Sequence, residues 1–385
     1  RKESSAASDV YKRQELDIPK ELIPSDKRFG VGPSLIPRAH LESLAIDCDR
    51  LLGTSHRKPP VQNLCSEMQE GLKKYFDLPE DYEIIMGNGG ATFLFDMIGL
   101  GLVKKKSLHF VTGEFSHKWY LSHKLVPFIE TELVSVDFGS GVAAYDDESA
   151  DMICMTLNET STGVQTPKLP KVNQETLLAI DATSGAGQIK VDFSKVDLYF
   201  FSPQKVFASE GGFYIAIMSP KAIKRAKALY ERETYRPEVM SWQHAIDNSL
   251  KNQTYNTPAI TSIYLLNEQV KLMNKLGEDE VIHMAQEKAN YIYSWADSHK
   301  YLSCFVKDKH YRSDAVATIN MDERFSANDL CQKLRELNIV VDIEAYRKLG
   351  MNQLRISLFH NVLFEDIVKL TKIIDYAIKQ EENLS

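Results

Sequence analysis

Short apolar runs alternate with longer amphipathic stretches along the middle of the sequence, from about residue 82 to residue 218. The runs are rich in β-branched and aromatic side chains, which predicts strands. The predicted strands are Glu83–Met86, Ser107–Thr112, Met152–Leu157, Leu177–Asp181, Asp197–Phe201 and Gly212–Met218. Alternation of short strands with longer helices predicts an α/β domain with a largely parallel sheet.

A second pattern follows a long helical stretch from about Thr261 to His299. It contains two further apolar runs, the segment IVVDIE and two amphipathic helices, and these predict a smaller α+β domain. The runs are Ala317–Met321 and Leu354–Phe359, and the helices are Ala327–Leu337 and a closing helix from Phe364. We therefore divide the chain into an N-terminal segment at 15–28, a large domain at 29–284 and a small domain at 285–385. Residues 1–14 are polar and non-periodic, which predicts a disordered leader or a foreign sequence.

The charge balance limits the partners that the chain is expected to have. Lys and Arg total 46 against 53 Asp and Glu, and the net charge of -7 gives no electrostatic reason to expect nucleic acid or a membrane surface. No apolar run is long enough to span a bilayer, and no signal sequence is evident. The 5 cysteines are far apart and form no C-x-x-C pair, which argues against a disulfide framework or a metal site. We expect a cytoplasmic protein.

Polar or glycine-rich segments directly follow three of the predicted strands. They are GNGGAT, NETSTG and SPQK. In a largely parallel sheet, ligands bind beyond the carboxyl ends of the strands. These three segments are therefore expected to form one site.

Lys205 and Asp181 suggest the chemistry of this site. Lys205 follows a strand and precedes a glycine pair that would let the backbone pack closely, whereas a lone lysine is usually a solvated surface residue. Asp181 ends a separate strand at the same edge of the sheet, although an aspartate there often only caps a turn. Pyridoxal phosphate requires a Schiff-base lysine and an acid that keeps its ring nitrogen protonated. The pair is consistent with that cofactor.

The segment Gly87–Gly99 places a glycine-rich turn between a strand and a helix. Backbone amides around Gly90, Ala91 and Thr92 can therefore point at a phosphate group. A dinucleotide-binding fingerprint would need glycine at position 92, so that alternative fails by one residue. A tight turn in which Thr92 caps the helix fits equally well.

Longer strings in the sequence are far more specific than these spacings, and together they resemble the phosphoserine aminotransferases, especially their actinobacterial-type branch. The resemblance runs from about Phe29 to the C-terminus. The strings are FGVGPSLIP, GTSHRKPPV, GNGGAT, GEFS, NETSTGV, IDATSGAG, PQKVFASEGG, DNSLKNQTYNTPAI and YRKLGMNQLRIS. The resemblance implies fold type I of the pyridoxal-phosphate enzymes, with a mostly parallel seven-stranded sheet, and a homodimer of the class V aminotransferase subgroup.

The resemblance also implies roles for the residues already singled out. Lys205 matches the Schiff-base lysine, with Gln204 beside it contacting the cofactor. Asp181 matches the partner of the ring nitrogen. Ala91 and Thr92 match the phosphate-binding loop, although Thr92 replaces an arginine that is common in the enteric-type branch.

Further cofactor contacts are implied from other parts of the chain. Thr160 matches the hydroxyl that bonds the ring oxygen. The aromatic residue that stacks on the ring aligns with Phe115, and Trp119 is close enough in sequence to remain an alternative. Asn256 and Thr257 match residues that reach the cofactor phosphate from the neighbouring subunit, so each site would need both chains.

Three arginines and a histidine are the candidates for binding an anionic substrate. Arg355 resembles the residue that grips the α-carboxylate, and His56 and Arg57 resemble the pair that recognises the distal phosphate or carboxylate. Arg347 is a further candidate, although the enteric-type enzymes have a His-Arg pair where this chain has Tyr346 and Arg347. The alternatives are a solvated surface for the His-Arg dipeptide and a structural ion pair for Arg355.

The activity implied is transfer of the amino group of L-glutamate to 3-phosphohydroxypyruvate, which gives O-phospho-L-serine and 2-oxoglutarate. Use of the related phosphorylated four-carbon keto acid of vitamin B6 synthesis stays open. The alternatives are an alanine- or serine-glyoxylate aminotransferase, a cysteine desulfurase and a catalytically silent binding protein. A desulfurase needs a reactive cysteine on a mobile loop, whereas Cys304 and Cys331 lie in strand-like and helical contexts. The presence of Lys205 and Asp181 argues against a silent protein.

Overall fold

A seven-stranded sheet forms the centre of the computed structural model, which describes residues 16–232 and 234–383. The strand order is β1-β9-β8-β7-β4-β2-β3, and β9 runs antiparallel to both of its neighbours while the other pairs are parallel. The strands are β1 Glu83–Asn88, β2 Lys106–Val111, β3 Glu130–Ser135, β4 Met152–Thr156, β7 Leu177–Asp181, β8 Leu198–Phe201 and β9 Phe213–Met218. The predicted α/β fold with a mostly parallel sheet is confirmed.

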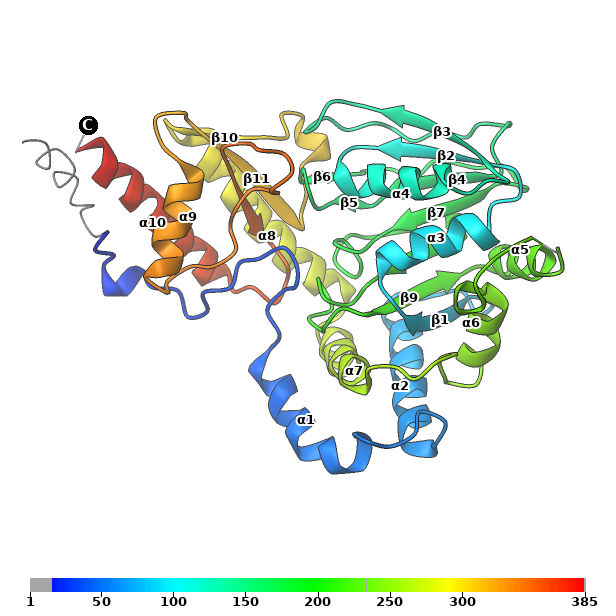
Figure 1. Ribbon diagram of the computed structural model, residues 1–385. Coiled ribbons are helices and arrows are strands. Elements are labelled where there is room, and N and C mark those ends of the chain that lie inside the picture. Colours follow the sequence, from blue (N-terminus) through cyan, green and yellow to red (C-terminus); the bar gives the residue numbers. More distant parts are fainter. Residues whose placement is uncertain (1–15, 233, 384–385) are drawn as a thin grey trace, which may run out of the picture.

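Helices cover both faces of this sheet (Figure 1). The buried residues of each strand alternate between two cores, as the pleat of a strand requires. In β4, Ile153 and Met155 pack into the core that contains α2 Pro59–Tyr75 and α7 Ile260–Leu276. Met152 and Cys154 pack into the other core. That second core contains α3 Ala91–Gly101, α4 Glu114–Lys124, α5 Pro220–Tyr230 and α6 Trp242–Ser249.

Two elements differ from the predictions. The strand β3 was missed, because it is an edge strand whose sequence ETELVS is only half-buried and contains no apolar run. The long helical stretch is two helices, α7 and α8 Glu278–Ser298, separated by Gly277. Gly277 has φ of 89°, a left-handed conformation that glycine adopts without strain and that ends the first helix.

The C-terminal unit contains a three-stranded antiparallel sheet of β10 Leu302–Cys304, β11 Val316–Met321 and β12 Gln353–Ser357. It is covered by α8, α9 Ala327–Glu336 and α10 Phe364–Glu382, on the left in Figure 1. The segment IVVDIE forms only isolated bridges there. Ile18 and Phe29 pack into the same core, and the predicted division at 284/285 lies inside α8. The predicted leader at 1–14 lies outside the described residues.

The remaining elements are short or lie at the periphery of the large sheet. They are α1 Arg38–Leu51, the small hairpin of β5 Asn158–Glu159 and β6 Val164–Gln165, and 3-10 helices at Lys20–Leu22, Phe193–Lys195, Glu238–Met240 and Lys309–Tyr311. Within 16–232 and 234–383, no helix has the length and apolar character needed to cross a membrane.

Candidate active site

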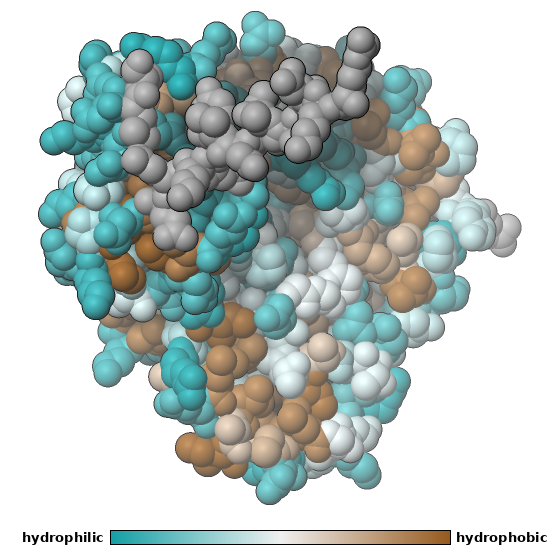
Figure 2. Space-filling view, turned by 60° about the vertical axis from the view of Figure 1, so that its left-hand side comes forward, coloured by the Kyte–Doolittle hydropathy of each residue, from teal (hydrophilic) through white to brown (hydrophobic). Residues whose placement is uncertain are grey.

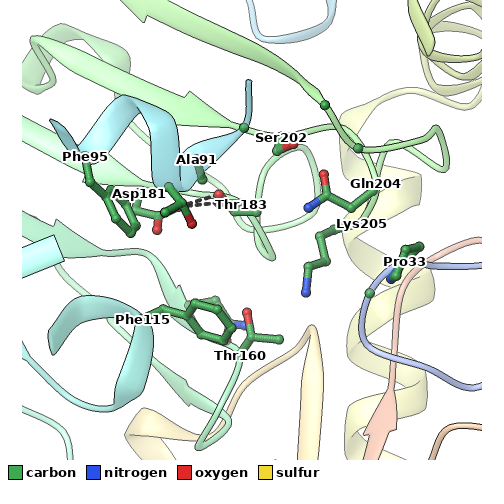
Figure 3. Close-up of a pocket in the computed structure, with 16 residues that line it drawn as sticks. Pro33, Ala91, Phe95, Phe115, Thr160, Asp181, Thr183, Ser202, Gln204 and Lys205 are labelled. Atoms are coloured by element: carbon green, nitrogen blue, oxygen red, sulfur yellow. Dashed lines mark hydrogen bonds between the residues drawn. The ribbon is translucent and has the colours of Figure 1, made fainter. Parts of the chain in front are cut away.

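A cavity of about 330 Å³ lies where the parallel strands β1, β2, β7 and β8 end (Figure 3). Seven of the residues predicted for the cofactor site line it, namely Ala91, Thr92, Phe115, Thr160, Asp181, Gln204 and Lys205. The structure therefore brings together segments that are more than 100 residues apart in the sequence. The glycine pair after Lys205 also lines the cavity. The prediction that it allows close backbone packing is wrong for Gly212, which has open space around it and adopts a positive φ of 81°.

Lys205 points into this cavity from the loop after β8 (Figure 3). Its Nζ donates a hydrogen bond to the carbonyl oxygen of Val31, in the loop that crosses the mouth of the site. That loop must approach closely, because a Cβ on Gly32 would lie 2.2 Å from Lys205 Nζ. Burial lowers the pKa of Lys205 to about 7, and the charge of Arg355 acts in the same direction. A substantial fraction of this amine is therefore neutral near pH 7.

Asp181 lies across the cavity from Lys205, at the end of β7 (Figure 3). One carboxylate oxygen accepts hydrogen bonds from the amide and the hydroxyl of Thr183, at 2.9 and 2.6 Å. Burial raises the pKa of Asp181 to about 6, and the nearby charge of Glu159 adds to that rise. A cationic group placed next to this carboxylate would offset the cost of its burial.

The first turn of α3 forms another wall of the cavity. No side chain caps this helix, and the amides of Ala91 and Thr92 have no acceptor among the described residues. Free amides at a helix N-terminus are a natural site for a phosphate group. Lys118 of α4 donates to the hydroxyl of Thr92 at 3.3 Å, so a cation lies beside this turn, which lacks the arginine of the enteric-type branch.

Phe115 and Thr160 form the side of the cavity below Lys205 in Figure 3. Phe115 is the second residue of α4, and its ring faces the cavity. Trp119 lies one turn further along the same helix and is buried in the core, stacked on Phe95. The structure thus places Phe115, and not Trp119, at the site. The hydroxyl of Thr160 donates to Ser184 at 2.8 Å.

Arg355 reaches the same wall from β12 of the C-terminal unit. One of its guanidinium nitrogens donates to the carbonyl oxygen of Thr160 at 3.2 Å, while its Nε is buried without a partner among the described residues. Burial lowers the pKa of Arg355 to about 10. No carboxylate pairs with this guanidinium in the described residues, so the predicted alternative of a structural ion pair finds no support there.

Tyr346 is a contact that the sequence did not predict. Its ring lies 5.5 Å from the ring of Phe115, centroid to centroid, and the guanidinium of Arg355 lies 5.3 Å from its centroid. The ring of Tyr346 therefore contacts both Phe115 and Arg355. The only sequence signal was that Tyr346 replaces the histidine of the enteric-type pair.

The remaining predicted site residues do not line this cavity. His56 is buried in the loop between α1 and α2, its Nε2 has no hydrogen-bond partner among the described residues, and burial lowers its pKa. Asn256 and Thr257 are exposed in the loop between α6 and α7, where their carbonyl oxygens accept from Asn88. The exposed residues Arg57 and Arg347 also lie outside the cavity.

Several cavity residues were not predicted at all. They are Gly32, Pro33, Phe95, Asn158, Thr183 and Ser202. Most of them lie in strings that carried the family resemblance, such as FGVGPSLIP, NETSTG and IDATSGAG. Neighbouring positions in those strings were therefore the signal that could have identified them.

A separate group of His109, His123 and Cys154 lies close enough together to hold a metal ion. Its histidines are already hydrogen-bonded, because Trp119 donates to His123 Nε2 at 3.0 Å and His109 Nε2 lies 3.1 Å from His123 Nδ1. Burial lowers the pKa of both histidines, so both rings are neutral. We interpret the group as a hydrogen-bonded part of the core.

Comparison with known proteins identifies the family. The model of the class-V aminotransferases matches residues 50–370. Phosphoserine aminotransferases from Rhodococcus opacus (strain B4) and Corynebacterium glutamicum (strain R) are each 43% identical to the chain over 94% of its length, and the matches cover 98% and 96% of those proteins. The crystal structure of a phosphoserine aminotransferase from Cytophaga hutchinsonii superimposes with a TM-score of 0.83 at 26% identity, covering 91% of this chain and 98% of that one. The chain belongs to the class-V aminotransferases and, within them, to the phosphoserine aminotransferase family.

Proposed function

We propose that this chain transfers the amino group of L-glutamate to 3-phosphohydroxypyruvate, which yields O-phospho-L-serine and 2-oxoglutarate, at the cavity between Lys205 and Asp181. The observation that carries the proposal is the placement of these two side chains on opposite walls of one cavity, with the free amides of α3 on a third. This arrangement is found in a chain that is 43% identical to curated phosphoserine aminotransferases.

Pyridoxal phosphate is the cofactor of this family, and the cavity fits its chemical groups. The uncapped amides of Ala91 and Thr92 suit the phosphate, Phe115 offers a flat apolar face to the ring, and Asp181 suits the protonated ring nitrogen. The buried Oε1 of Gln204 is without a hydrogen-bond partner in the described residues and is available to the bound molecule. When bound, the cofactor supplies an aldehyde carbon that takes up the amino group and a ring that accepts electrons.

Lys205 and Asp181 divide the proton chemistry between them. The amine of Lys205, neutral for much of the time near pH 7, would take the proton from the substrate's α-carbon as a general base and deliver it, as a general acid, to the cofactor carbon that bears the nitrogen. Asp181 stays ionised beside a cation and so holds a proton on the ring nitrogen.

Both substrates carry two anionic groups, and the predicted arginines and histidine are the residues that bind them. Arg355 lies beside Thr160 and binds the α-carboxylate in a bidentate way, for which its planar guanidinium is suited. The distal carboxylate of glutamate and the phosphate of phosphohydroxypyruvate share one charge sign, so a single cationic subsite serves both. We assign that subsite to His56 and Arg57, with Arg347 as a further contact.

The uptake of cofactor should depend on pH through Lys205. A neutral amine is the nucleophile, and its fraction rises with pH through a pKa of about 7. We therefore expect the rate at which cofactor-free protein takes up pyridoxal phosphate to increase between pH 6 and 8 with a midpoint near 7. Stopped-flow absorbance measures this rate. The same reaction with Nα-acetyl-lysine corrects for ionisation of the cofactor itself, and a midpoint close to that of free lysine would contradict the expectation.

A comparison of amino acceptors tests the proposed substrate. Purified enzyme is incubated with L-glutamate together with one acceptor, and formation of 2-oxoglutarate is followed. The acceptors compared are 3-phosphohydroxypyruvate, hydroxypyruvate, pyruvate and glyoxylate. We expect kcat/KM to be highest for the phosphorylated acceptor, by at least about 100-fold, since the other acceptors offer no distal anion to the arginines of the subsite. Equal or better use of glyoxylate or pyruvate would favour an alanine- or serine-glyoxylate type of enzyme. Adding the phosphorylated four-carbon keto acid to the series addresses vitamin B6 synthesis.

We further propose a homodimer in which each cavity is completed by the neighbouring subunit. Burial and the charge of Arg57 lower the pKa of His56 while the backbone of Thr254 raises it, so the loop that carries His56 lies beside the loop that carries Asn256. Neither loop lines the cavity of its own chain, and one neighbour could receive both. Apolar side chains are exposed on the adjacent helix α1, and Figure 2 shows brown surface at the lower end of the molecule, where Figure 1 places that helix. The exposed side chains there are Leu41, Ile46 and Leu52.

Mixed dimers test whether the sites are shared. Lys205→Ala and Arg57→Ala chains are co-expressed with different tags, and the mixed dimers are purified. If Arg57 acts in the neighbour's cavity, one of the two sites of each mixed dimer is intact, and the purified mixed dimers should regain about half of the wild-type activity. If Arg57 acts in its own chain, no site is intact and the mixture stays as inactive as its parents.

We also infer that the enzyme works in the cytoplasm and has no nucleic-acid partner. The net charge of -7 supports this. The cysteines are unpaired in the described structure, as expected in a reducing compartment.

A further inference from the structure

Glu159 is a buried carboxylate that neither the proposed chemistry nor the family resemblance uses. It precedes Thr160 at the end of β5, and none of its surface is exposed. No lysine, arginine or histidine pairs with it among the described residues. An ionised carboxylate without a cationic partner is costly to bury, so its hydrogen bonds must offset that cost.

Five hydrogen bonds hold this carboxylate, and all come from two short segments. One oxygen accepts from the amide of Phe115 at 3.2 Å and from the amide and hydroxyl of Ser161 at 3.3 and 2.6 Å. The other accepts from the amide and hydroxyl of Ser116, at 2.9 and 2.7 Å. Glu159 therefore uses both oxygens as acceptors only.

These bonds provide α4 with a cap that the helix itself lacks. Its N-cap residue is Gly113, which has no side chain. The amides of Phe115 and Ser116 are bound by Glu159, and that of Glu114 is bound by Ser161 at 3.0 Å. A negative charge at a helix N-terminus is favourable. A Cβ at position 113 would lie 2.5 Å from Glu159 Cγ, so the close approach also explains the glycine.

The first turn that Glu159 caps is the one that carries the aromatic wall of the cavity. The amide of Phe115 is one of those capped, and Thr160 is the next residue after Glu159, so one carboxylate joins the two residues that form this side of the cavity. Burial is the main cause of the pKa shifts of Lys205 and Asp181, and the charge of Glu159 raises both. The carboxylate thus also contributes to the electrostatics of the cavity.

We propose that Glu159 is a positioning residue, which holds the ring of Phe115 against the cofactor by capping α4 through both of its oxygens. The part played by Phe115 rests on the proposed function. In Glu159→Gln, an NH₂ group replaces one acceptor oxygen and faces N–H or O–H donors, so the first turn of α4 has to shift. Glu159→Asp keeps two acceptor oxygens, so it should retain part of the wild-type position of the Phe115 ring.

The test follows the ring itself before any cofactor is added. 4-Fluorophenylalanine is placed at position 115, and its ¹⁹F NMR resonance is recorded in the cofactor-free protein. The proposal expects Glu159→Gln to shift or broaden this resonance and to weaken the binding of pyridoxal phosphate about tenfold. Asp151→Asn is the matched control, because Asp151 is also a carboxylate that accepts from three consecutive amides, of Lys104, Lys105 and Lys106, and it does not line the cavity. The control should lower the melting temperature and leave both the resonance and cofactor affinity unchanged.

The opposite result would overturn the proposal. If Glu159→Gln lowers only the melting temperature, as the control does, then Glu159 stabilises the fold without positioning the ring. If that variant does not fold, Ser161→Ala removes one hydroxyl donor to the same carboxylate and must itself shift the resonance, otherwise the proposal fails. These readouts do not depend on which amino acid is the substrate. A failure of the proposed function would therefore appear in the acceptor series and leave this test unaffected.

Discussion

Lys205→Ala is expected to abolish transamination, with kcat reduced by about 10⁴-fold, which is the upper end of what a positioned general base contributes. The variant has no amine that can bind the cofactor or move the α-proton across the cavity. We expect its purified form to lack the yellow absorbance of the lysine-bound cofactor. Steady-state kinetics and the absorbance spectrum measure the two effects.

Lys288 provides a control for the loss of a buried lysine. Burial lowers its pKa to about 7 as well, but its ammonium group donates to the carbonyl oxygens of Phe359 and Val362 and does not face the cavity. Lys288→Met should lower stability and keep the cofactor absorbance. Retention of the absorbance in the Lys205→Ala variant, or its loss in both variants, would contradict the role assigned to Lys205.

Asp181→Asn is expected to have the second largest effect. The substitution preserves the shape of the side chain but removes the charge that holds a proton on the ring nitrogen. We expect kcat to fall roughly 100-fold, near the upper limit for one hydrogen bond to a charged group, and cofactor affinity to fall in parallel. Equilibrium binding and single-turnover kinetics separate the two effects.

Asp192→Asn is a suitable control for this variant. Asp192 accepts from the amide and hydroxyl of Ser194, two residues later, in the same pattern as Asp181 with Thr183, but on the surface. It should leave catalysis unchanged. If Asp181→Asn also retains wild-type kcat, then Asp181 only caps the turn after β7, which is the alternative that the sequence left open.

The strands that could be predicted from the sequence are those buried on both faces. Residues in β4, β7 and β9 alternate between two apolar cores, so the strands themselves are continuous apolar runs. The edge strand β3 has no such run and was missed. Parallel strands that end at one edge bring the segments after them together, which is why Lys205, Asp181 and the first turn of α3 could be assigned to one site.

Contacts between distant segments could not be predicted in the same way. Phe115 and Trp119 are one helical turn apart, and only the packing of α4 on the sheet decides which ring faces the cavity. The contact of Tyr346 with Phe115, and the cap that Glu159 provides to α4, depend on where separate segments meet. The role proposed for His56 and Arg57 involves a second chain, which the sequence of one chain does not place.

The half-reactions of the purified enzyme test the central proposal most directly. Cofactor absorbance is recorded after mixing with O-phospho-L-serine, L-glutamate, L-serine or L-alanine, each in a single half-reaction without an acceptor, and Lys205→Ala is the control. We expect phosphoserine and glutamate to convert the cofactor to its amine form much more efficiently than serine and alanine do. Conversion by serine or alanine that is equal or faster would retain the cofactor chemistry of Lys205 and contradict the assignment of phosphoserine as substrate.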